Sequence, residues 1–147
     1  MNKEHGKYSL CCEGQIIFLE AYEAWNEESS TSCINEMKFI VNTMQHNNFA
    51  ILANSLKLEG MTPESFNLWF EALDFFFKNG HNFFIRIDKP SSIEYKLFSE
   101  PFDKITKQRM PFQFANSTNE AIKILKENNY YGFDNGIIEM NCIKNNV

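Results

Sequence analysis

The sequence predicts a single-domain α/β fold, because a strand, a helix and a second strand follow one another between residues 48 and 88. Residues 49–53 are a short apolar run, residues 66–77 are a strongly aromatic stretch with helical spacing, and residues 83–88 are a second apolar run. A strand, a crossover helix and a strand place two parallel strands in one sheet, with an almost always right-handed connection. Together with the elements below, this gives the order β-β-α-β-α-β-α-β-α. We therefore expect a mixed, mainly parallel sheet of about five strands flanked by helices.

The first two strands are expected to form a β-hairpin. Residues 8–12 and 16–22 are short apolar runs, and Glu13, Gly14 and Gln15 separate them. Two apolar runs this close together, with a glycine between them, are typical of a hairpin.

A first helix should follow the hairpin. The Ser/Thr cluster at residues 29–32 is typical of a helix N-cap, and the acidic residues just before it suit the positive end of the helix dipole. Beyond the cluster, five side chains recur at helical spacing and form one stripe that faces the core: Cys33, Met37, Ile40, Val41 and Met44.

The aromatic helix at residues 66–77 has the most clearly marked ends in the chain. Thr62 suits the N-cap, Pro63 the first helical position and Gly80 the residue just beyond the C-terminus. Apolar side chains cover roughly 220° of its circumference, whereas a helix that rests on a sheet needs about 100°.

The excess apolar arc of this helix includes Leu68, Ala72 and Phe75, and it must be covered by something. Packing against a neighbouring helix of the same chain is the simplest explanation. A homodimer is the main alternative, and a bound ligand is a further one. Leu68, Ala72 and Phe75 are therefore a candidate partner surface.

The next elements are marked by caps and prolines. A helix is expected at residues 93–99, where Pro101 ends or kinks it. Residues 110–114 are a last short strand, and Ser117, three residues before Glu120, is typical of the capping box of a final helix.

The domain is expected to span residues 1–131, followed by a tail at residues 132–147. The tail carries Ile137, Ile138 and Ile143, which favour either a loose strand or a contact with a partner. Its end is expected to be disordered.

Composition excludes two classes of partner. The net charge is −5 and the pI is about 5.2, which argues against nucleic acid, because phosphate binding needs a basic patch. No apolar run approaches the roughly 18 residues of a membrane span, so no integral membrane association is expected.

The cysteines are expected to be reduced. The four cysteines include no CxxC pair, and the first residues lack the apolar run of a signal peptide. Reduced thiols in a cytoplasmic protein are the expectation that follows.

No residue pattern predicts catalysis, a metal or a cofactor. His5, His46 and His81 lie at element ends or in the N-terminal tail, without metal-ligand spacing. Nucleophile elbows, Walker loops and dinucleotide-binding motifs are absent from the sequence. The sequence therefore predicts neither an enzyme nor a cofactor site.

One ligand site is suggested by topology alone. In open α/β sheets, ligands bind beyond the carboxyl ends of the parallel strands. Asn54 and Ser55 follow one predicted strand, and Asp88, Ser91 and Ser92 follow the next, just before a helix N-terminus that could hold an anion. The alternative is a capped turn, with Ser91 or Ser92 as the N-cap and Ser55 in a turn of its own.

Several short segments, together with the order of elements, point to a known family. The segments are Gly14, residues 24–26, residues 49–52, residues 60–64, residues 112–114 and residues 118–121. From about residue 8 to residue 125 the chain resembles the SpoIIAA-like group, whose fold is shared with STAS domains. The resemblance implies a mixed sheet flanked by helices, without catalysis, and often a role in protein–protein regulation.

The chain departs from this family at one segment. Anti-sigma-factor antagonists of this fold carry an Asp-Ser-Ser-Gly-type segment after the third strand, where a serine is phosphorylated. Residues 54–62 lack it, with Ser55 and Thr62 as the nearest hydroxyls, so the phosphorylation switch does not carry over.

We therefore expect a non-enzymatic SpoIIAA/STAS-like module that acts through protein–protein contacts, in a regulatory or scaffolding role. The alternative is a binding module for an apolar or lipid-like small molecule. It depends on the aromatic share of 15%, which includes 15 Phe, although core packing explains this share more simply.

Overall fold

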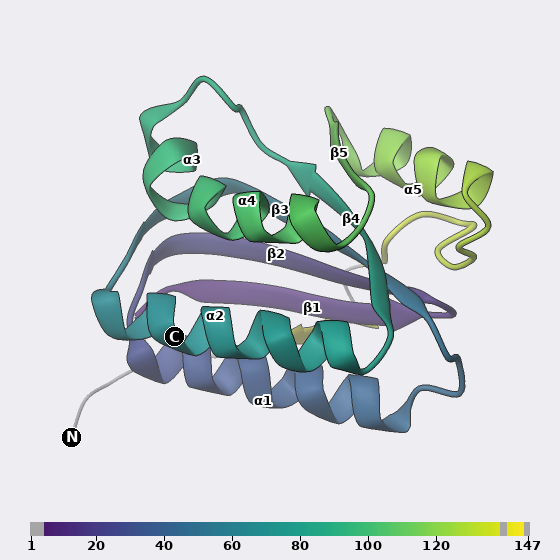
Figure 1. Cartoon of the computed structure of the whole chain (residues 1–147), viewed down its shortest axis with the longest axis horizontal. Helices are drawn as coiled ribbons and strands as arrows, with labels where there is room; N and C mark the ends of the chain where they lie inside the picture. The colour runs from purple at the N-terminus through teal and green to yellow at the C-terminus, as the bar shows by residue number, and fades with distance from the viewer. Residues whose placement is uncertain (1–4, 139–140, 146–147) are drawn as a thin grey trace.

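The computed structural model describes residues 5–138 and 141–145, which form a six-stranded sheet with helices on both faces (Figure 1). The strand order is β5-β4-β3-β2-β1-β6, in which β2 to β5 run parallel and β1 pairs antiparallel with both β2 and β6. The elements in chain order are β1 (Lys7–Glu13), β2 (Ile16–Trp25), α1 (Glu27–Thr43), β3 (Phe49–Met61), α2 (Pro63–Lys78), β4 (His81–Ile87), α3 (Ile93–Phe98), α4 (Glu100–Arg109), β5 (Phe112–Ala115), α5 (Thr118–Glu127) and β6 (Ile143–Lys144). The predicted α/β fold is confirmed, and the sheet has one strand more than expected.

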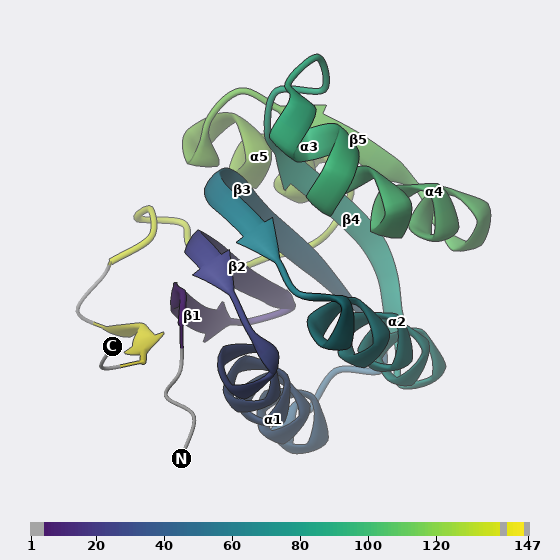
Figure 2. The same cartoon turned by 90° about the vertical axis from the view of Figure 1, so that its left-hand side faces the viewer.

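The helices divide between the two faces of the sheet (Figure 2). Helices α1, α2 and α4 pack on one face, and α5 packs on the other, so each face has its own apolar core. Successive side chains of a strand point to opposite faces of the sheet, so strands β1 to β5 each contribute apolar side chains to both cores.

The predicted crossover is confirmed, because β3 and β4 pair in parallel and α2 connects them. Thr62 caps α2, with its Oγ1 accepting a hydrogen bond from the Ser65 N–H at 3.3 Å, and Pro63 occupies the first turn. Gly80 follows the C-terminus with φ +110°, and a Cβ there would lie 2.4 Å from the Asn47 carbonyl oxygen. Only glycine fits this position.

Helix α1 begins earlier than predicted. Asn26 is the N-cap: its Oδ1 accepts from the Ser29 N–H at 3.1 Å, and the Ser29 Oγ accepts from the Asn26 N–H at 3.2 Å. The prediction that residues 29–32 form the cap is wrong, because these residues lie inside the first turns. Ser30 is buried there and accepts a hydrogen bond from the Trp69 indole N–H at 3.1 Å.

Strand β3 is longer than predicted and runs through Asn54 and Ser55 to Met61. Asn-Ser pairs are typical of turns because their side chains bond to nearby backbone, and the Asn54 Oδ1 does accept from the Leu56 N–H at 3.1 Å. Here the bond accompanies a bulge, since the register with β2 shifts between the pairs at Glu20 and Tyr22. The strand bends at this point and does not end.

The region around Pro101 contains two helices where one was predicted. Helix α3 ends at Phe98, and Pro101 then occupies the first turn of a second helix, α4. Proline is tolerated at this position because it needs no backbone N–H there. The following strand is the predicted one, shifted to Phe112–Ala115, and Ser117 caps α5 as expected.

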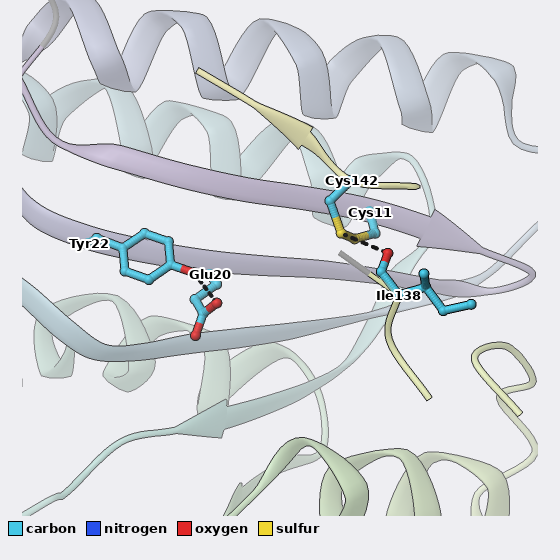
Figure 3. Close-up of a disulfide and its surroundings, with 5 residues drawn as sticks. All are labelled: Cys11, Glu20, Tyr22, Ile138 and Cys142. Atoms are coloured by element: carbon cyan, nitrogen blue, oxygen red, sulfur yellow. Dashed lines mark hydrogen bonds between the residues drawn. A yellow bond between two sulfur atoms is a disulfide. The ribbon is translucent and has the colours of Figure 1, made fainter. Parts of the chain in front are cut away.

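The tail returns along β1. Strand β6 pairs with β1 at Ser9 and Leu10, and Cys11 is joined to Cys142 by a disulfide with a Cα–Cα distance of 4.5 Å (Figure 3). The expectation of four reduced thiols is wrong for this pair, because β6 brings together residues that lie 131 positions apart. Residues 139–140 and 146–147 of the predicted tail lie outside the described residues.

Candidate functional site

A buried ion pair lies between β4 and α4. The Arg86 side chain projects from β4, and its Nη2 contacts Asp103 Oδ1 at 2.6 Å, while its Nε lies 3.3 and 3.2 Å from the two carboxylate oxygens. Both residues are buried. Burial alone would lower the pKa of Arg86, but the charge of Asp103 and the hydrogen bonds to it raise that pKa above its ordinary value.

Tyr95 of α3 completes the surroundings of Asp103. Its hydroxyl donates to Asp103 Oδ2 at 2.7 Å. Burial raises the pKa of Tyr95, and the hydrogen bond and charge of Asp103 raise it further, so Tyr95 acts as a neutral donor. Two side chains therefore satisfy this carboxylate, as a buried charge requires.

Two serines connect this ion pair to the end of β4. Ser55 Oγ donates to Asp88 Oδ2 at 2.5 Å, and it lies 3.5 Å from Arg86 Nη1 and 3.4 Å from Ser99 Oγ. We call the six side chains the Arg86 cluster: Ser55, Arg86, Asp88, Tyr95, Ser99 and Asp103.

The structure brings together only some of the predicted ligand-binding residues. Ser55 and Asp88 lie in the Arg86 cluster, and Asn54 lies beside it, with its Nδ2 donating to Glu20 Oε2 at 3.2 Å.

The other two predicted residues lie outside the cluster. Ser92 is the N-cap of α3 and accepts from the Tyr95 N–H at 3.1 Å, as the alternative interpretation held. Ser91 is exposed and takes no part in the cluster.

Figure 3 shows the neighbouring Glu20, which also accepts a hydrogen bond from the Tyr22 hydroxyl. Asn54 and Tyr22 thus both bond to one carboxylate on the sheet. Asn54 and Tyr22 therefore find their partner in Glu20, and the Arg86 cluster is the better polar candidate for binding a ligand.

A cavity of about 80 Å³ adjoins the Arg86 cluster, between the sheet and helices α1, α2 and α4. Its polar lining consists of Asn54, Ser55, Arg86 and Ser99. The rest is apolar or aromatic: Leu19, Ala21, Trp25, Met37, Ile51, Ala53, Leu58, Met61, Trp69, Leu73, Phe76, Phe84, Phe98 and Phe102. The cavity is therefore apolar over most of its wall and polar where it meets the Arg86 cluster.

Phenylalanine rings join α2 to α3 and α4 beside this cavity. Phe102 lies 5.3 Å from Phe66 and 4.7 Å from Phe70 between ring centroids, and Phe98 lies 6.4 Å from Phe66. Such ring contacts are favourable, and they join α2 to α3 and α4 through apolar side chains.

The predicted partner surface on α2 is largely used within the chain. Ala72 is buried, and Leu68 and Phe75 are half-buried against the core that α1 shares. The Lys38 ammonium of α1 also lies 5.0 Å from the Phe75 ring centroid. Helix α1 thus accounts for most of the excess apolar arc.

The Arg86 cluster contains neither a histidine nor a cysteine. No group of three or more His, Cys, Asp or Glu side chains in the described residues could hold a metal ion. His81, the one buried histidine among the residues described, contacts Phe49 and Phe84 rather than the Arg86 cluster.

Arg86, Tyr95, Ser99 and Asp103 were not singled out from the sequence. One local signal was available: Arg86 is a charged residue inside the apolar run from Phe83 to Ile87, which requires a buried partner. The identity of the partner depends on how α4 packs, and no spacing in the sequence specifies that.

Comparison with known proteins identifies the fold. No model of a protein family matches the sequence, and no curated protein matches it either. Among solved structures, the chain is similar to an uncharacterised protein of the DUF3478 family with a SpoIIAA-like fold from Shewanella loihica PV-4. That likeness has a TM-score of 0.64 and 12% identity, and covers 85% of this chain and 98% of the other.

It is also similar to the anti-sigma factor antagonist SpoIIAA in its unphosphorylated form. The TM-score is 0.58 and the identity 12%, over 81% of this chain and 97% of the other. The chain therefore has a SpoIIAA/STAS-like fold, and the predicted resemblance is confirmed at that level. None of the described helices is both long and apolar enough to span a membrane.

Proposed function

We propose that this chain is a non-catalytic SpoIIAA-like module that acts through contact with another protein, in a regulatory or scaffolding role. One of the two similar folds supports the proposal, since it belongs to an anti-sigma factor antagonist. The observation that carries it is an exposed apolar patch formed by Leu56 of β3 and two residues of α3.

The α3 patch consists of Leu56, Ile93 and Leu97, which are 45%, 67% and 54% exposed. Ile93 and Leu97 are one helical turn apart on α3, and Leu56 lines the same surface hollow as the first turn of that helix. Charged side chains of both signs line the hollow: Glu23, Lys57, Glu59, Asp88, Lys89 and Glu94. Exposed apolar side chains that lie near charged ones are typical of protein interfaces.

Site-specific photo-crosslinking in the native host tests this function. A photoreactive phenylalanine analogue at Leu97 should give one discrete adduct, and Ile93→Glu in the same chain should abolish it. Phe39 on α1 is 66% exposed and lies outside the patch, so the analogue at that position is the matched control. Equal adducts at both positions, or none at Leu97, would contradict the proposal.

A homodimer through Leu68, Ala72 and Phe75 stays a prediction with weaker support, because α1 already covers much of that face. Light scattering at tens of micromolar decides it. A monomer would remove the claim.

The cavity supports a second candidate function, the binding of an apolar small molecule. Its wall is mostly apolar, and four Phe rings, Phe76, Phe84, Phe98 and Phe102, line it. Concave, mainly apolar sites with a few polar groups are the usual form of small-molecule sites.

A further inference from the structure

We propose that the cavity binds a small, uncharged, mainly apolar molecule that carries one hydrogen-bond acceptor, with the acceptor placed at the Arg86 cluster. The inference rests on the second candidate function above and specifies the chemistry of its ligand. Three properties of the cavity support it: the available donors, the local charge and the volume.

The donors come from Arg86 and Ser99. Arg86 Nη1 carries two N–H groups, yet its protein contact is the Ser55 Oγ at 3.5 Å. The Ser99 Oγ likewise reaches the Ser55 Oγ at 3.4 Å. Both contacts are at the long limit for a hydrogen bond, so a ligand oxygen at normal distance would be a better acceptor than Ser55.

The local charge favours a neutral ligand over an ion. Arg86 contributes one positive charge, whereas Asp103 and Asp88 contribute two negative charges, and Arg86 is already paired with Asp103. A carboxylate ligand would add a third negative charge beside the pair, in a mainly apolar cavity. A cationic ligand would instead have to lie against the Arg86 guanidinium. A carbonyl or hydroxyl oxygen carries no net charge, so it avoids both the added negative charge and the contact between two cations.

The volume limits the size of the ligand. The cavity of about 80 Å³ is about half the size of an apolar cavity of 150 Å³ that takes benzene. We therefore expect a short chain of a few carbon atoms, or the end of a longer one that leaves between α2 and α4.

Three probes of matched length test the proposal on the full chain: pentan-2-one, pentane and pentanoate, at pH 7.5. Binding is followed through the methyl resonances of Met37 and Ile51 in the cavity, with Ile122 of α5 on the opposite face as control. Pentan-2-one should shift Met37 and Ile51 saturably and bind at least about fivefold more tightly than pentane, as expected for one hydrogen bond from Ser99 or from the charged Arg86. Pentanoate should bind at least tenfold more weakly than pentan-2-one.

Two variants locate the site. Ala53→Leu should abolish binding of pentan-2-one by filling the cavity, and Leu73→Trp serves the same purpose should the first variant fail to fold. Ser99→Ala should reduce the preference for pentan-2-one over pentane. Unchanged affinity in a folded cavity-filling variant would overturn the site.

The other outcomes separate the two claims. Equal affinity for pentan-2-one and pentane, or tighter binding of pentanoate, would overturn the proposed chemistry but leave the cavity as a small-molecule site. Binding of none of the three probes would overturn both this inference and the second candidate function.

Discussion

His81, at the start of β4, should make the protein less stable in mild acid than at neutral pH. The ring is buried, with centroids 5.5 Å from Phe49 and 5.8 Å from Phe84. Its Nε2 lies 3.1 Å from the Phe83 carbonyl oxygen, and its Nδ1 has no hydrogen-bond partner in the part of the chain that the structure describes. Burial lowers the pKa of His81 from 6.5 to about 3, against a smaller opposite effect of the Phe83 carbonyl.

The sign and size of the effect follow from linkage. A pKa that is depressed in the folded state means that the unfolded chain binds the proton more readily, so stability is complete above pH 6.5 and is lost as the pH falls toward about 3. At pH 5.0, about 1.5 units below the unfolded value, the loss is about 2 kcal/mol at 1.36 kcal/mol per unit.

The assay is urea unfolding at pH 7.5 and at pH 5.0, followed by the fluorescence of Trp25 and Trp69. The loss between the two pH values should be about 2 kcal/mol smaller in His81→Phe than in the wild type. His46 is exposed, so His46→Gln is the matched control and should behave like the wild type. Equal losses in His81→Phe and the wild type would refute the reasoning.

Three further predictions concern the buried ion pair, the disulfide and a turn. Asp103→Ala should lower the free energy of unfolding in urea by about 3–5 kcal/mol, because it leaves Arg86 buried and unpaired. The double variant Arg86→Met with Asp103→Leu should recover most of that stability. A decrease under about 1 kcal/mol in Asp103→Ala would contradict this. Cys142→Ser should lower the free energy of unfolding by about 2–4 kcal/mol, and dithiothreitol should lower that of the wild type equally. Cys12→Ser, at an exposed free thiol, should change it little. An unaltered stability of the wild type in dithiothreitol would count against the disulfide. Gly80→Ala should lower the free energy of unfolding by about 1–3 kcal/mol, because its Cβ would meet the Asn47 carbonyl oxygen. Gly136 has open space around it, so Gly136→Ala should have a smaller effect. Equal effects would exclude the steric explanation.

The parts of the fold that the sequence predicts well are those encoded by neighbouring residues. Thr62, Pro63 and Gly80 mark α2 through contacts within one or two turns, and Ser117 marks α5 in the same way. The start of α1 was predicted one turn late, because the Ser/Thr cluster and Asn26 are both suited to capping. In the structure Asn26 caps the helix, and Ser30 is a buried partner of Trp69 instead.

The parts that could not be predicted depend on distant residues. The bulge that carries β3 past Asn54 is visible only against β2, and the disulfide of Cys11 needs a tail that returns from residue 142. In the site, the topological rule placed Ser55 near Asp88, and the two side chains do form a hydrogen bond. It could not supply Asp103, because that residue lies on α4, a second helix that was not predicted from the sequence.

The same contacts explain where a ligand would enter the cavity. Helix α2 is held to α1 by the hydrogen bond from Trp69 to Ser30, and α4 is held to β4 by the buried pair of Arg86 and Asp103. Helices α2 and α4 meet through ring contacts and through Arg109. Arg109 pairs with Asp74 at 3.5 Å and lies 5.0 Å from the Phe77 ring centroid, and the ion pair is partly exposed and therefore weak. Separating α2 from α4 would break these ring and Arg109 contacts, but neither the Trp69–Ser30 hydrogen bond nor the Arg86–Asp103 pair. A ligand that enters between α2 and α4 would therefore meet the Arg86 cluster as the fixed end of the cavity.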